Sequence, residues 1–579
     1  MEIASKSELN NWDEIDWVKV DSSVFKLQKR IYRASLAEDY KLVHKLQKLM
    51  VKSWYGKLLA VRKVTQENKG KKTAGIDGIK SVSPSKRLAL VDELAIDGNA
   101  NPTRRVWIPK PGKKEMRPLG IPTMLDRAKQ SLLKMAIEPE WEAKFEGNSF
   151  GFRPGRSCHD AIKAIKDSIR TKSKYVLDAD IASCFDKIKH DTLLNKINTL
   201  PEFRSQIKAW LKSGVVDFSK WSQRKGYNQT LAGTPQGGVI SPLLANIALH
   251  GMENKLKEYV MGIPKRFPSG GMMSKDKRAK ALSVICYADD FVIIHDEIDT
   301  VLKCKEIIEE WLKNLDLELK PSKTRIAHTL DVYNGEQLGF DFLGFHIQHH
   351  ELGKHHSGKN SSSKKLGFKT IIEPQKEKIQ LHYRKLDECI NKMSSHKQSE
   401  LIGKLIPIIR GWCNYQSPWN SSKAFKKLTN LMWNRLWRWG KRRHPNKGRK
   451  WISRKYWDLK NKGWRFTFKS EDFVYTLPKH SDFSCGKMWV KVQNTRSPFD
   501  GNETYWSKRM GDRYLTSDPQ KSRLLKKQKG KCGYCGLNFH SEDLTEKHHI
   551  KEKSKGGNNS DKNLVLIHLH CHDQVHGKR

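Results

Sequence analysis

The sequence predicts a multidomain α+β chain, and three observations support that fold class. Residues 283–294 place two β-prone apolar runs around Ala288-Asp289-Asp290, the pattern of two strands joined by a tight turn. Apolar residues recur at helical spacing over 23–64, 379–390 and 425–436, so helices are expected there. The length of 579 residues allows roughly four domains.

The charge of the chain indicates a polyanionic partner. Lysine and arginine number 109 and aspartate and glutamate 63, which leaves a net charge of +46 spread along the whole sequence. The 18 tryptophans stand repeatedly beside arginine and lysine, a mixture suited to stacking on bases and pairing with phosphates. We therefore expect nucleic acid to be the main partner.

A membrane partner is not expected, because no apolar run approaches the length of a membrane helix and no lipidation motif is present. The N-terminal residues do not have the pattern of a signal peptide. The 10 cysteines are scattered, apart from Cys532, Cys535 and Cys571, which favours a reducing compartment and one metal site over a disulfide framework. We expect a cytoplasmic protein, with the bacterial cytosol or nucleoid favoured and an organelle left open.

Residues 106–122 predict a basic β-hairpin with a glycine turn. Its cationic side chains are Lys110, Lys113, Lys114 and Arg117, and they could neutralise a triphosphate, although a solvated hairpin tip is the simpler interpretation. The stretch 151–157 has two arginines around a Pro-Gly turn, which also suits phosphate binding.

Carboxylates mark the centre of the chain. Asp289 and Asp290 are adjacent and would repel each other, and a divalent cation could offset that repulsion. The predicted strand 175–181 places Asp178 and Asp180 on one face. Phosphoryl transfer with two metal ions needs carboxylates that converge from separate strands, and this strand supplies a third one.

Seven ordered blocks lie between residues 106 and 345. They are the hairpin ending Arg117-Pro-Leu-Gly-Ile-Pro-Thr123, Gly151–Ser157, Asp180-Ile-x-x-Cys-Phe-Asp186, Pro235-Gln-Gly-Gly238, Tyr287-Ala-Asp-Asp290, Lys320-Pro-Ser-Lys-Thr324 and Phe340-Asp-Phe-Leu-Gly-Phe345. Together they resemble the reverse transcriptases encoded by group II introns. The resemblance implies a right-hand polymerase with fingers and palm, in which Asp180, Asp289 and Asp290 hold two Mg²⁺ ions. Asp178 and Asp186 are near alternatives to Asp180.

The same resemblance implies roles for residues around an incoming deoxynucleoside triphosphate. Phe185 would clash with a ribose 2′-hydroxyl, and Gln236 would pack on the nucleotide. Lys323 would protonate the pyrophosphate leaving group. The triphosphate would be held by Arg117 together with Lys110 or Lys113, and the choice between the two lysines stays open.

The region after residue 370 resembles the thumb, or maturase, domain of this family through Arg410-Gly-Trp-Cys-Asn-Tyr415, Arg443-His-Pro445 and Trp451–Tyr456. The resemblance implies binding of the parent intron RNA, whose own chemistry performs splicing. Residues 497–506 resemble the family's DNA-binding segment. The residues expected to bind RNA are Arg410, Trp412, Arg435, Arg438, Arg442 and Arg443.

The C-terminal residues predict a structural zinc site. Cys532-x-x-Cys535 and His568-x-x-Cys571 form two ligand pairs, which suits one tetrahedral Zn²⁺. A redox Cys-x-x-Cys is the alternative, and His570 could replace His568.

The pattern of His548-His549, Asn563 and Cys571-His572 within this frame resembles the HNH nucleases. The resemblance implies that His549 is the general base and that Asn563 orients its imidazole. His548, His572 and His576 would hold one divalent metal ion, Mg²⁺ or another.

We expect a multifunctional group II intron protein that acts as reverse transcriptase, maturase and DNA endonuclease. It would stay bound to the intron lariat, nick target DNA and prime reverse transcription there (retrohoming). Alternatives are a non-enzymatic splicing maturase and a reverse transcriptase of another retroelement or of a defence system. The expected domains are an N-terminal RNA-binding extension with the start of the fingers (1–95), fingers and palm (96–350), a basic linker (351–370), the thumb (371–470), a DNA-binding segment (471–525) and a small zinc-stabilised ββα-metal HNH domain (526–579).

Overall fold

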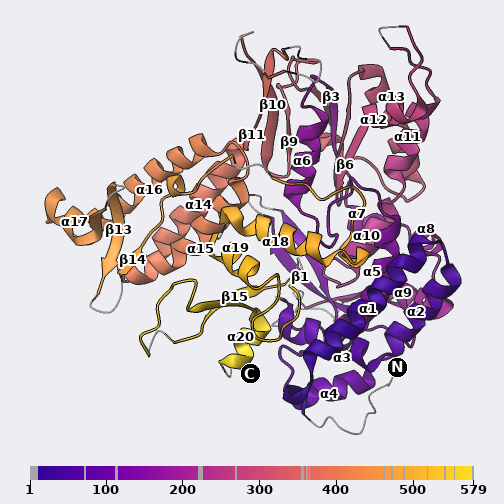
Figure 1. Cartoon of the computed structure of the whole chain (residues 1–579), viewed down its shortest axis with the longest axis horizontal. Helices are drawn as coiled ribbons and strands as arrows, with labels where there is room; N and C mark the ends of the chain where they lie inside the picture. The colour runs from indigo at the N-terminus through magenta and orange to yellow at the C-terminus, as the bar shows by residue number, and fades with distance from the viewer. Residues whose placement is uncertain are drawn as a thin grey trace.

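The computed structural model arranges the chain as a central polymerase-like body, with a helical domain on one side and the C-terminal domain beneath (Figure 1). In the view of Figure 1, the N-terminal helices lie at the lower right, and the C-terminal helix α20 lies at the lower centre. The structure describes the chain except for residues 1–10, 69, 71–72, 111, 113–114, 219–225, 268–269, 354–355, 357, 360–362, 364, 461–462, 471–473, 487–488, 518, 540–542, 553–554 and 577–579.

The palm is a four-stranded antiparallel sheet of order β6-β7-β3-β8. The strands are β6 (Ser283–Tyr287), β7 (Asp290–His295), β3 (Tyr175–Asp180) and β8 (Arg325–His328). Leu177 and Ala179 face one hydrophobic core, whereas Val176 faces a second core on the opposite side. The sheet is buried on both faces because the side chains of a strand alternate between them.

The predicted basic hairpin is confirmed as β1 (Thr103–Pro109) paired antiparallel with β2 (Met116–Ile121). Two short strands, β4 (Val215–Asp217) and β5 (Gly226–Asn228), extend this sheet in the order β2-β1-β4-β5. The hairpin and the palm therefore belong to separate sheets.

Three helices form the N-terminal part and pack on the long helix α5 (Met124–Lys144). They are α1 (Trp17–Leu36), α2 (Tyr40–Lys52) and α3 (Trp54–Arg62). Each begins after a residue whose side-chain oxygen accepts backbone N–H groups of the first turn, which satisfies donors that the helix leaves unpaired. These residues are Asp16, Asp39 and Ser53.

The thumb region is a helical bundle with a small sheet of order β12-β13-β14 at one end. Its helices are α14 (Lys376–Lys392), α15 (Gln398–Gln416), α16 (Ser422–Arg443) and α17 (Arg449–Tyr456). Leu386, Ile390 and Leu436 are buried in its core, as the helical spacing predicted. The strands are β12 (Trp457–Lys460), β13 (Gly463–Lys469) and β14 (Val474–Thr476).

The predicted linker at 351–370 falls largely at the end of a β-hairpin. Strand β10 (Phe345–Glu351) pairs antiparallel with β11 (Phe368–Pro374) and with β9 (Phe340–Phe342). This three-stranded sheet contributes Phe340 and Ile347 to the core behind the palm sheet, so it connects the palm to the thumb directly.

The remaining elements complete the polymerase body and the C-terminal region. They are η1 (Trp12–Glu14), the π-helical η2 (Lys63–Glu67), α4 (Pro84–Glu93), α6 (Cys158–Ser168), α7 (Cys184–Lys187), α8 (His190–Ile197), α9 (Pro201–Lys212), α10 (Ser241–Leu249), α11 (Met252–Gly262), α12 (Lys275–Ala281), α13 (Ile298–Lys313), η4 (Pro321–Lys323), η5 (His480–Asp482), η6 (Pro498–Asp500), α18 (Glu503–Ser517), α19 (Pro519–Lys527), β15 (Thr545–His549), β16 (Leu564–His568) and α20 (Leu569–Val575).

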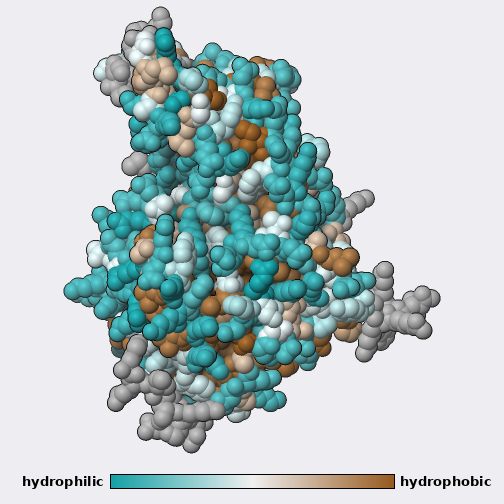
Figure 2. All heavy atoms as spheres, turned by 90° about the vertical axis from the view of Figure 1, so that its right-hand side faces the viewer, coloured by the Kyte–Doolittle hydropathy of each residue, from teal (hydrophilic) through white to brown (hydrophobic). Residues whose placement is uncertain are grey.

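Hydrophilic side chains dominate the face shown in Figure 2, and the hydrophobic ones lie in scattered patches. Within the described part of the chain, every helix is too short or too polar to cross a membrane.

The segment that follows the thumb is fastened to the palm by one buried carboxylate, Asp160 of α6, which is 0% exposed. Its Oδ1 accepts hydrogen bonds from Trp489 Nε1 at 3.2 Å, from the Val492 backbone N–H at 3.0 Å and from Arg509 Nη2 at 2.6 Å. Its Oδ2 accepts from the backbone and hydroxyl of Ser157. Residues 489–509 are therefore part of the polymerase body.

Replacing this carboxylate should loosen the segment. In Asp160→Ala the half-buried Arg509 loses its carboxylate partner, and the buried Val492 N–H loses its acceptor, which costs about 1–3 kcal/mol for that donor alone. We expect faster hydrogen exchange in residues 489–509 with little change in β3. The matched control is Asp167→Ala on the same helix, whose ion pair with Lys163 is partly exposed and contributes roughly 0–1 kcal/mol. Equal exchange in the two variants would contradict this role.

Candidate active sites

Three carboxylates meet at the end of the palm sheet. Asp180 is the last residue of β3 and lies directly opposite Asp290, the first residue of β7. Asp289 stands in the turn just before Asp290, and its backbone carbonyl accepts a hydrogen bond from the Ile181 N–H at 3.1 Å. The structure thus brings together the three aspartates that the sequence predicted to act together.

Burial and mutual repulsion both disfavour the charged forms of these carboxylates. Burial, followed by the charges of Asp289 and Asp180, raises the pKa of Asp290 to about 7. Burial also raises the pKa of Asp289. Lys323 Nζ lies 2.7 Å from Asp180 Oδ2 and offsets part of the negative charge. Oxygen ligands held close together against their own repulsion fit a divalent cation of the Mg²⁺ type.

The two alternative aspartates have other partners. Asp178 pairs with Arg325 at 3.6 Å and lies opposite Val292, two residues further into the sheet. Asp186 accepts hydrogen bonds from Gln236 Nε2 on both oxygens, each at 3.2 Å. The register of β3 and β7 therefore favours Asp180 as the third carboxylate.

Close backbone packing fixes the turn that presents Asp289. Ala288 adopts a φ of 59°, in the left-handed region that turns use. A Cβ on Gly151 would lie 2.3 Å from the Ala288 nitrogen, so only glycine fits beside the turn. The neighbouring Phe150 N–H donates to the Cys286 carbonyl at 2.9 Å, which ties residues 148–151 to the hairpin.

The predicted nucleotide-binding residues differ in their exposure and in the partners that they already have. Phe185 on α7 is half-buried and packs edge-on against Phe152 with ring centroids 6.0 Å apart. Arg117 is exposed on β2, and its charge acts on both Asp289 and Asp186. Lys110 forms an ion pair with Glu115 at 2.7 Å within the hairpin. Lys113 lies outside the described residues, so the choice between the two lysines stays open.

The two arginines of the 151–157 block do not face a phosphate site. Arg153 is buried and makes a two-point ion pair with Glu142, at 2.8 and 3.0 Å. Arg156 is also buried and donates to the carbonyls of Gly147 and Asn494 at 2.7 and 2.9 Å. The expectation of phosphate binding is wrong for this pair, because their guanidinium groups are used inside the protein.

The four predicted zinc ligands converge. The donor atoms of Cys532, Cys535, His568 and Cys571 all lie within 4.8 Å of one another. His568 Nδ1 faces the sulfurs, at 3.3 Å from Cys535 Sγ, and its Nε2 lies 3.2 Å from Asp543. A carboxylate behind a ligating histidine fixes the ring orientation, so the donor set fits a structural Zn²⁺.

A second histidine group lies in the same domain. The ring nitrogens of His548, His572 and His576 also lie within 4.8 Å of one another. His548 comes from β15 and His572 from α20, and His576 is the residue that caps the C-terminus of α20, four positions after His572. Three neutral imidazoles fit one divalent ion.

Among the described residues, the hydrogen bonds of the Asn563 side chain go to the loop and not to the imidazole of His549. The Asn563 amide bridges the loop, because it accepts from the Lys551 N–H at 2.8 Å and donates to the carbonyls of Lys551 and Asn558 at 3.0 and 2.8 Å. His549 Nε2 lies 2.8 Å from Asn559 Oδ1. The residue beside the imidazole is therefore Asn559, which the sequence pattern did not single out.

The residues expected to bind RNA divide into two groups. Arg410, Arg438 and Arg442 are exposed on α15 and α16. The other three have partners inside the bundle. Trp412 stacks on His382 at 4.5 Å, Arg435 pairs with Asp387 and Asn391, and Arg443 donates to the carbonyls of Ser394 and His396.

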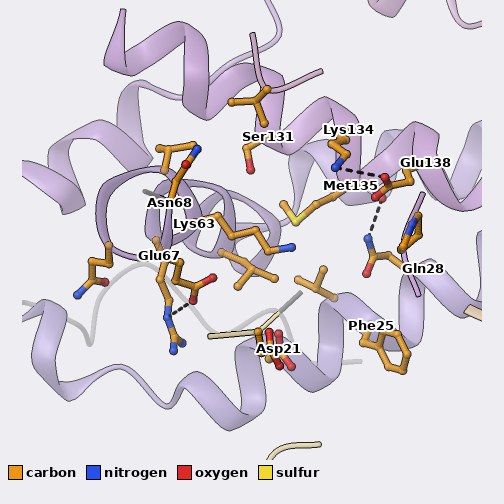
Figure 3. Close-up of a pocket in the computed structure, with 18 of the residues that line it drawn as sticks. Asp21, Phe25, Gln28, Lys63, Glu67, Asn68, Ser131, Lys134, Met135 and Glu138 are labelled. Atoms are coloured by element: carbon orange, nitrogen blue, oxygen red, sulfur yellow. Dashed lines mark hydrogen bonds and ion pairs between the residues drawn. The ribbon is translucent and has the colours of Figure 1, made fainter. Parts of the chain in front are cut away.

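A cavity of about 410 Å³ lies where the C-terminal domain meets the N-terminal helices. Figure 3 shows Asp21, Lys63, Glu67 and Lys134 around it. Asp543, the carboxylate behind the zinc ligand His568, also lines this cavity. The Cys-His cluster therefore lies at the junction of the two regions.

Family profiles match most of the chain. They are described as N-terminal domain of reverse transcriptase (residues 12–94), reverse transcriptase (RNA-dependent DNA polymerase) (108–347), group II intron, maturase-specific domain (379–457) and HNH endonuclease (532–578). The palm carboxylates and these domains define the class, a reverse transcriptase with an attached endonuclease domain.

Relatives narrow the class to one family. Protein YkfC of Escherichia coli is 34% identical over 318 residues, 50% of this chain and 79% of that protein. The group II intron-encoded protein LtrA of Lactococcus lactis is 30% identical over 412 residues, 60% of this chain and 66% of that protein. Maturase-like protein 1 of Euglena gracilis is 26% identical over 412 residues, 69% of this chain and 76% of that protein. The chain belongs to the family of group II intron-encoded proteins and has the domains of an intron mobility protein.

Removing one zinc ligand should unfold the C-terminal domain alone. In Cys571→Ala we expect bound zinc, measured by elemental analysis, to fall from about one ion per chain to nearly none, because a structural site needs all four ligands. Limited proteolysis should then cut within 526–579, while primer extension persists because the palm has its own core. Cys389→Ala in the thumb is the control and should keep its zinc. Full zinc in Cys571→Ala would contradict the assignment.

Proposed function

We propose that this protein moves its parent group II intron into DNA by target-primed reverse transcription. The intron lariat, held by the protein, inserts into one DNA strand by reverse splicing. The C-terminal domain nicks the other strand, and the palm extends the new 3′ end with intron RNA as the template. The observation that supports this most strongly is the alignment of Asp180 with Asp290, which gives the chain a polymerase centre separate from its nuclease centre.

The palm residues have distinct roles in synthesis. Asp180, Asp289 and Asp290 hold two Mg²⁺ ions, which when bound activate the primer hydroxyl and neutralise the triphosphate. Phe185 excludes a ribose 2′-hydroxyl, and Gln236 packs on the incoming nucleotide.

Cationic side chains from the fingers and from the palm contact the triphosphate. Arg117 binds it from the fingers, with a hairpin lysine, Lys110 or Lys113, beside it. Lys323 delivers a proton to the pyrophosphate. Burial opposes its charge, but the hydrogen bond to Asp180 and the nearby carboxylates raise the pKa of Lys323 and keep it protonated.

The C-terminal domain acts as a DNA-nicking module. Its Zn²⁺ site, made by Cys532, Cys535, His568 and Cys571, is structural. His549 removes a proton from the attacking water. His548, His572 and His576 hold one divalent ion, which when bound places the scissile phosphate and stabilises its charge.

The thumb binds intron RNA through its exposed arginines. Arg410, Arg438 and Arg442 are free of the intramolecular bonds that occupy Arg435 and Arg443 among the described residues, so they suit phosphate contacts. The segment 489–509, fastened to the palm by Asp160, supplies a DNA-binding surface that keeps a fixed position relative to the polymerase centre.

Loss of one palm carboxylate should abolish DNA synthesis. For Asp290→Asn we expect primer extension on poly(rA)/oligo(dT) with Mg²⁺ to fall roughly 100-fold or more, because the charge that holds the metal ions is lost. Splicing support should stay nearly intact. Asp276→Asn, on the exposed helix α12, is the matched control. If Asp290→Asn also destroyed splicing at normal protein levels, the proposed division of labour would be wrong.

Loss of the general base should affect nicking alone. For His549→Ala we expect nicking of a labelled target duplex to disappear, while oligo(dT)-primed synthesis and splicing persist. His350→Ala, an exposed histidine on β10, should behave as the unmodified protein. Normal nicking by His549→Ala would rule out the assigned base.

A further inference from the structure

The imidazole of His549 has a partner on the loop between β15 and β16. His549 Nε2 lies 2.8 Å from the amide oxygen Oδ1 of Asn559. Asn559 is exposed, and it follows the glycine pair Gly556-Gly557 in this loop. The contact therefore joins an exposed side chain of the loop to a half-buried imidazole on β15.

This contact selects one form of the imidazole. An amide oxygen only accepts hydrogen bonds, so Nε2 must carry the hydrogen and donate it. In the neutral ring the other nitrogen, Nδ1, then has the free lone pair. A general base needs such a lone pair at a fixed position toward its water, which means that the partner on Nε2 determines which ring atom can take the proton.

Hydrogen bonds on both sides of Asn559 fix the loop that carries it. Its backbone carbonyl accepts a hydrogen bond from Gln520 Nε2 at 2.8 Å. Two residues later, Asp561 accepts from Gln520 at 3.0 Å and pairs with Arg523 of α19. On the other side, Asn563 fastens the loop through the carbonyls of Lys551 and Asn558. Bonds on both sides of Asn559 thus limit where its amide can point.

We propose that Asn559 is a positioning residue for DNA nicking, which accepts the Nε2 hydrogen of His549 and leaves Nδ1 as the atom that takes the proton from water. This rests on the proposed nuclease function of the C-terminal domain. Asn563 then acts one step further away, because it shapes the loop that presents Asn559.

The test compares two substitutions of Asn559 in the full-length chain assembled with its intron RNA. Asn559→Ala removes the acceptor, and we expect kcat for nicking to fall about 10- to 100-fold with little change in KM for the DNA, because a misoriented base slows the proton transfer and not the binding. Asn559→Asp keeps an acceptor oxygen of the same shape and should restore kcat to within several-fold. The substrate is a 5′-labelled duplex that spans the intron insertion junction.

Controls separate this role from simple unfolding and from failure of the nuclease assignment. Zinc content and oligo(dT)-primed synthesis should be unchanged in both variants. Asn538→Ala removes an amide elsewhere in the domain, where Asn538 donates to Glu503 at 3.1 Å, and should nick normally. Normal nicking by Asn559→Ala, or equal losses in the Ala and Asp variants, would overturn the proposal. Normal nicking by His549→Ala would overturn both the assigned base and the role of Asn559. If the unmodified protein itself does not nick the duplex, the proposed nuclease function has failed.

Discussion

The antiparallel pairing of β3 with β7 is the constraint on which the rest of the molecule depends. Their register places Asp180 opposite Asp290 at the open end of a sheet that is otherwise buried on both faces. The hydrophobic residues along the two strands stabilise this register, since a shift by one residue would turn every side chain to the other face. The sheet can therefore hold three carboxylates together although they repel one another.

Residues 151–160 stabilise the turn that carries Asp289 and connect it to the segment after the thumb. Gly151 permits backbone contact with the turn at Ala288, and Arg153 and Arg156 fix the block that follows it. Asp160, at the start of the next helix, binds the segment after the thumb. One short stretch of chain thus touches the polymerase centre on one side and the proposed DNA-binding segment on the other. The proposed DNA-binding segment is therefore tied to the palm through this stretch.

The chain separates two kinds of metal chemistry by the ligands that it offers. The palm provides only carboxylate oxygens, the donors that a hard cation prefers. The C-terminal domain provides one cluster of thiolates with a histidine and another cluster of histidines alone. The thiolate cluster also lies at the junction with the N-terminal helices, where Asp543 contacts His568 and lines the shared cavity. The cluster that stabilises the C-terminal domain and the surface that attaches this domain to the N-terminal helices therefore share the His568–Asp543 contact.

The sequence by itself indicated where candidate carboxylates and metal ligands lie, because spacing along a strand or a ligand pair is a local property. The Asp289-Asp290 turn and the Cys532-x-x-Cys535 pair could be identified in this way, whereas the choice of Asp180 over Asp178 came from the family resemblance. Local patterns also predicted the basic hairpin, two of the palm segments and two of the thumb helices. Only the tertiary structure decided which polar side chains are already bonded to other groups of the protein. Arg153, Arg156, Arg435 and Arg443 look like phosphate ligands in the sequence, yet each has partners that come from distant or separate elements. The same holds for Asn559, whose contact with His549 depends on how a glycine-containing loop folds back over a strand. Such pairings join residues through space, and no local pattern encodes them.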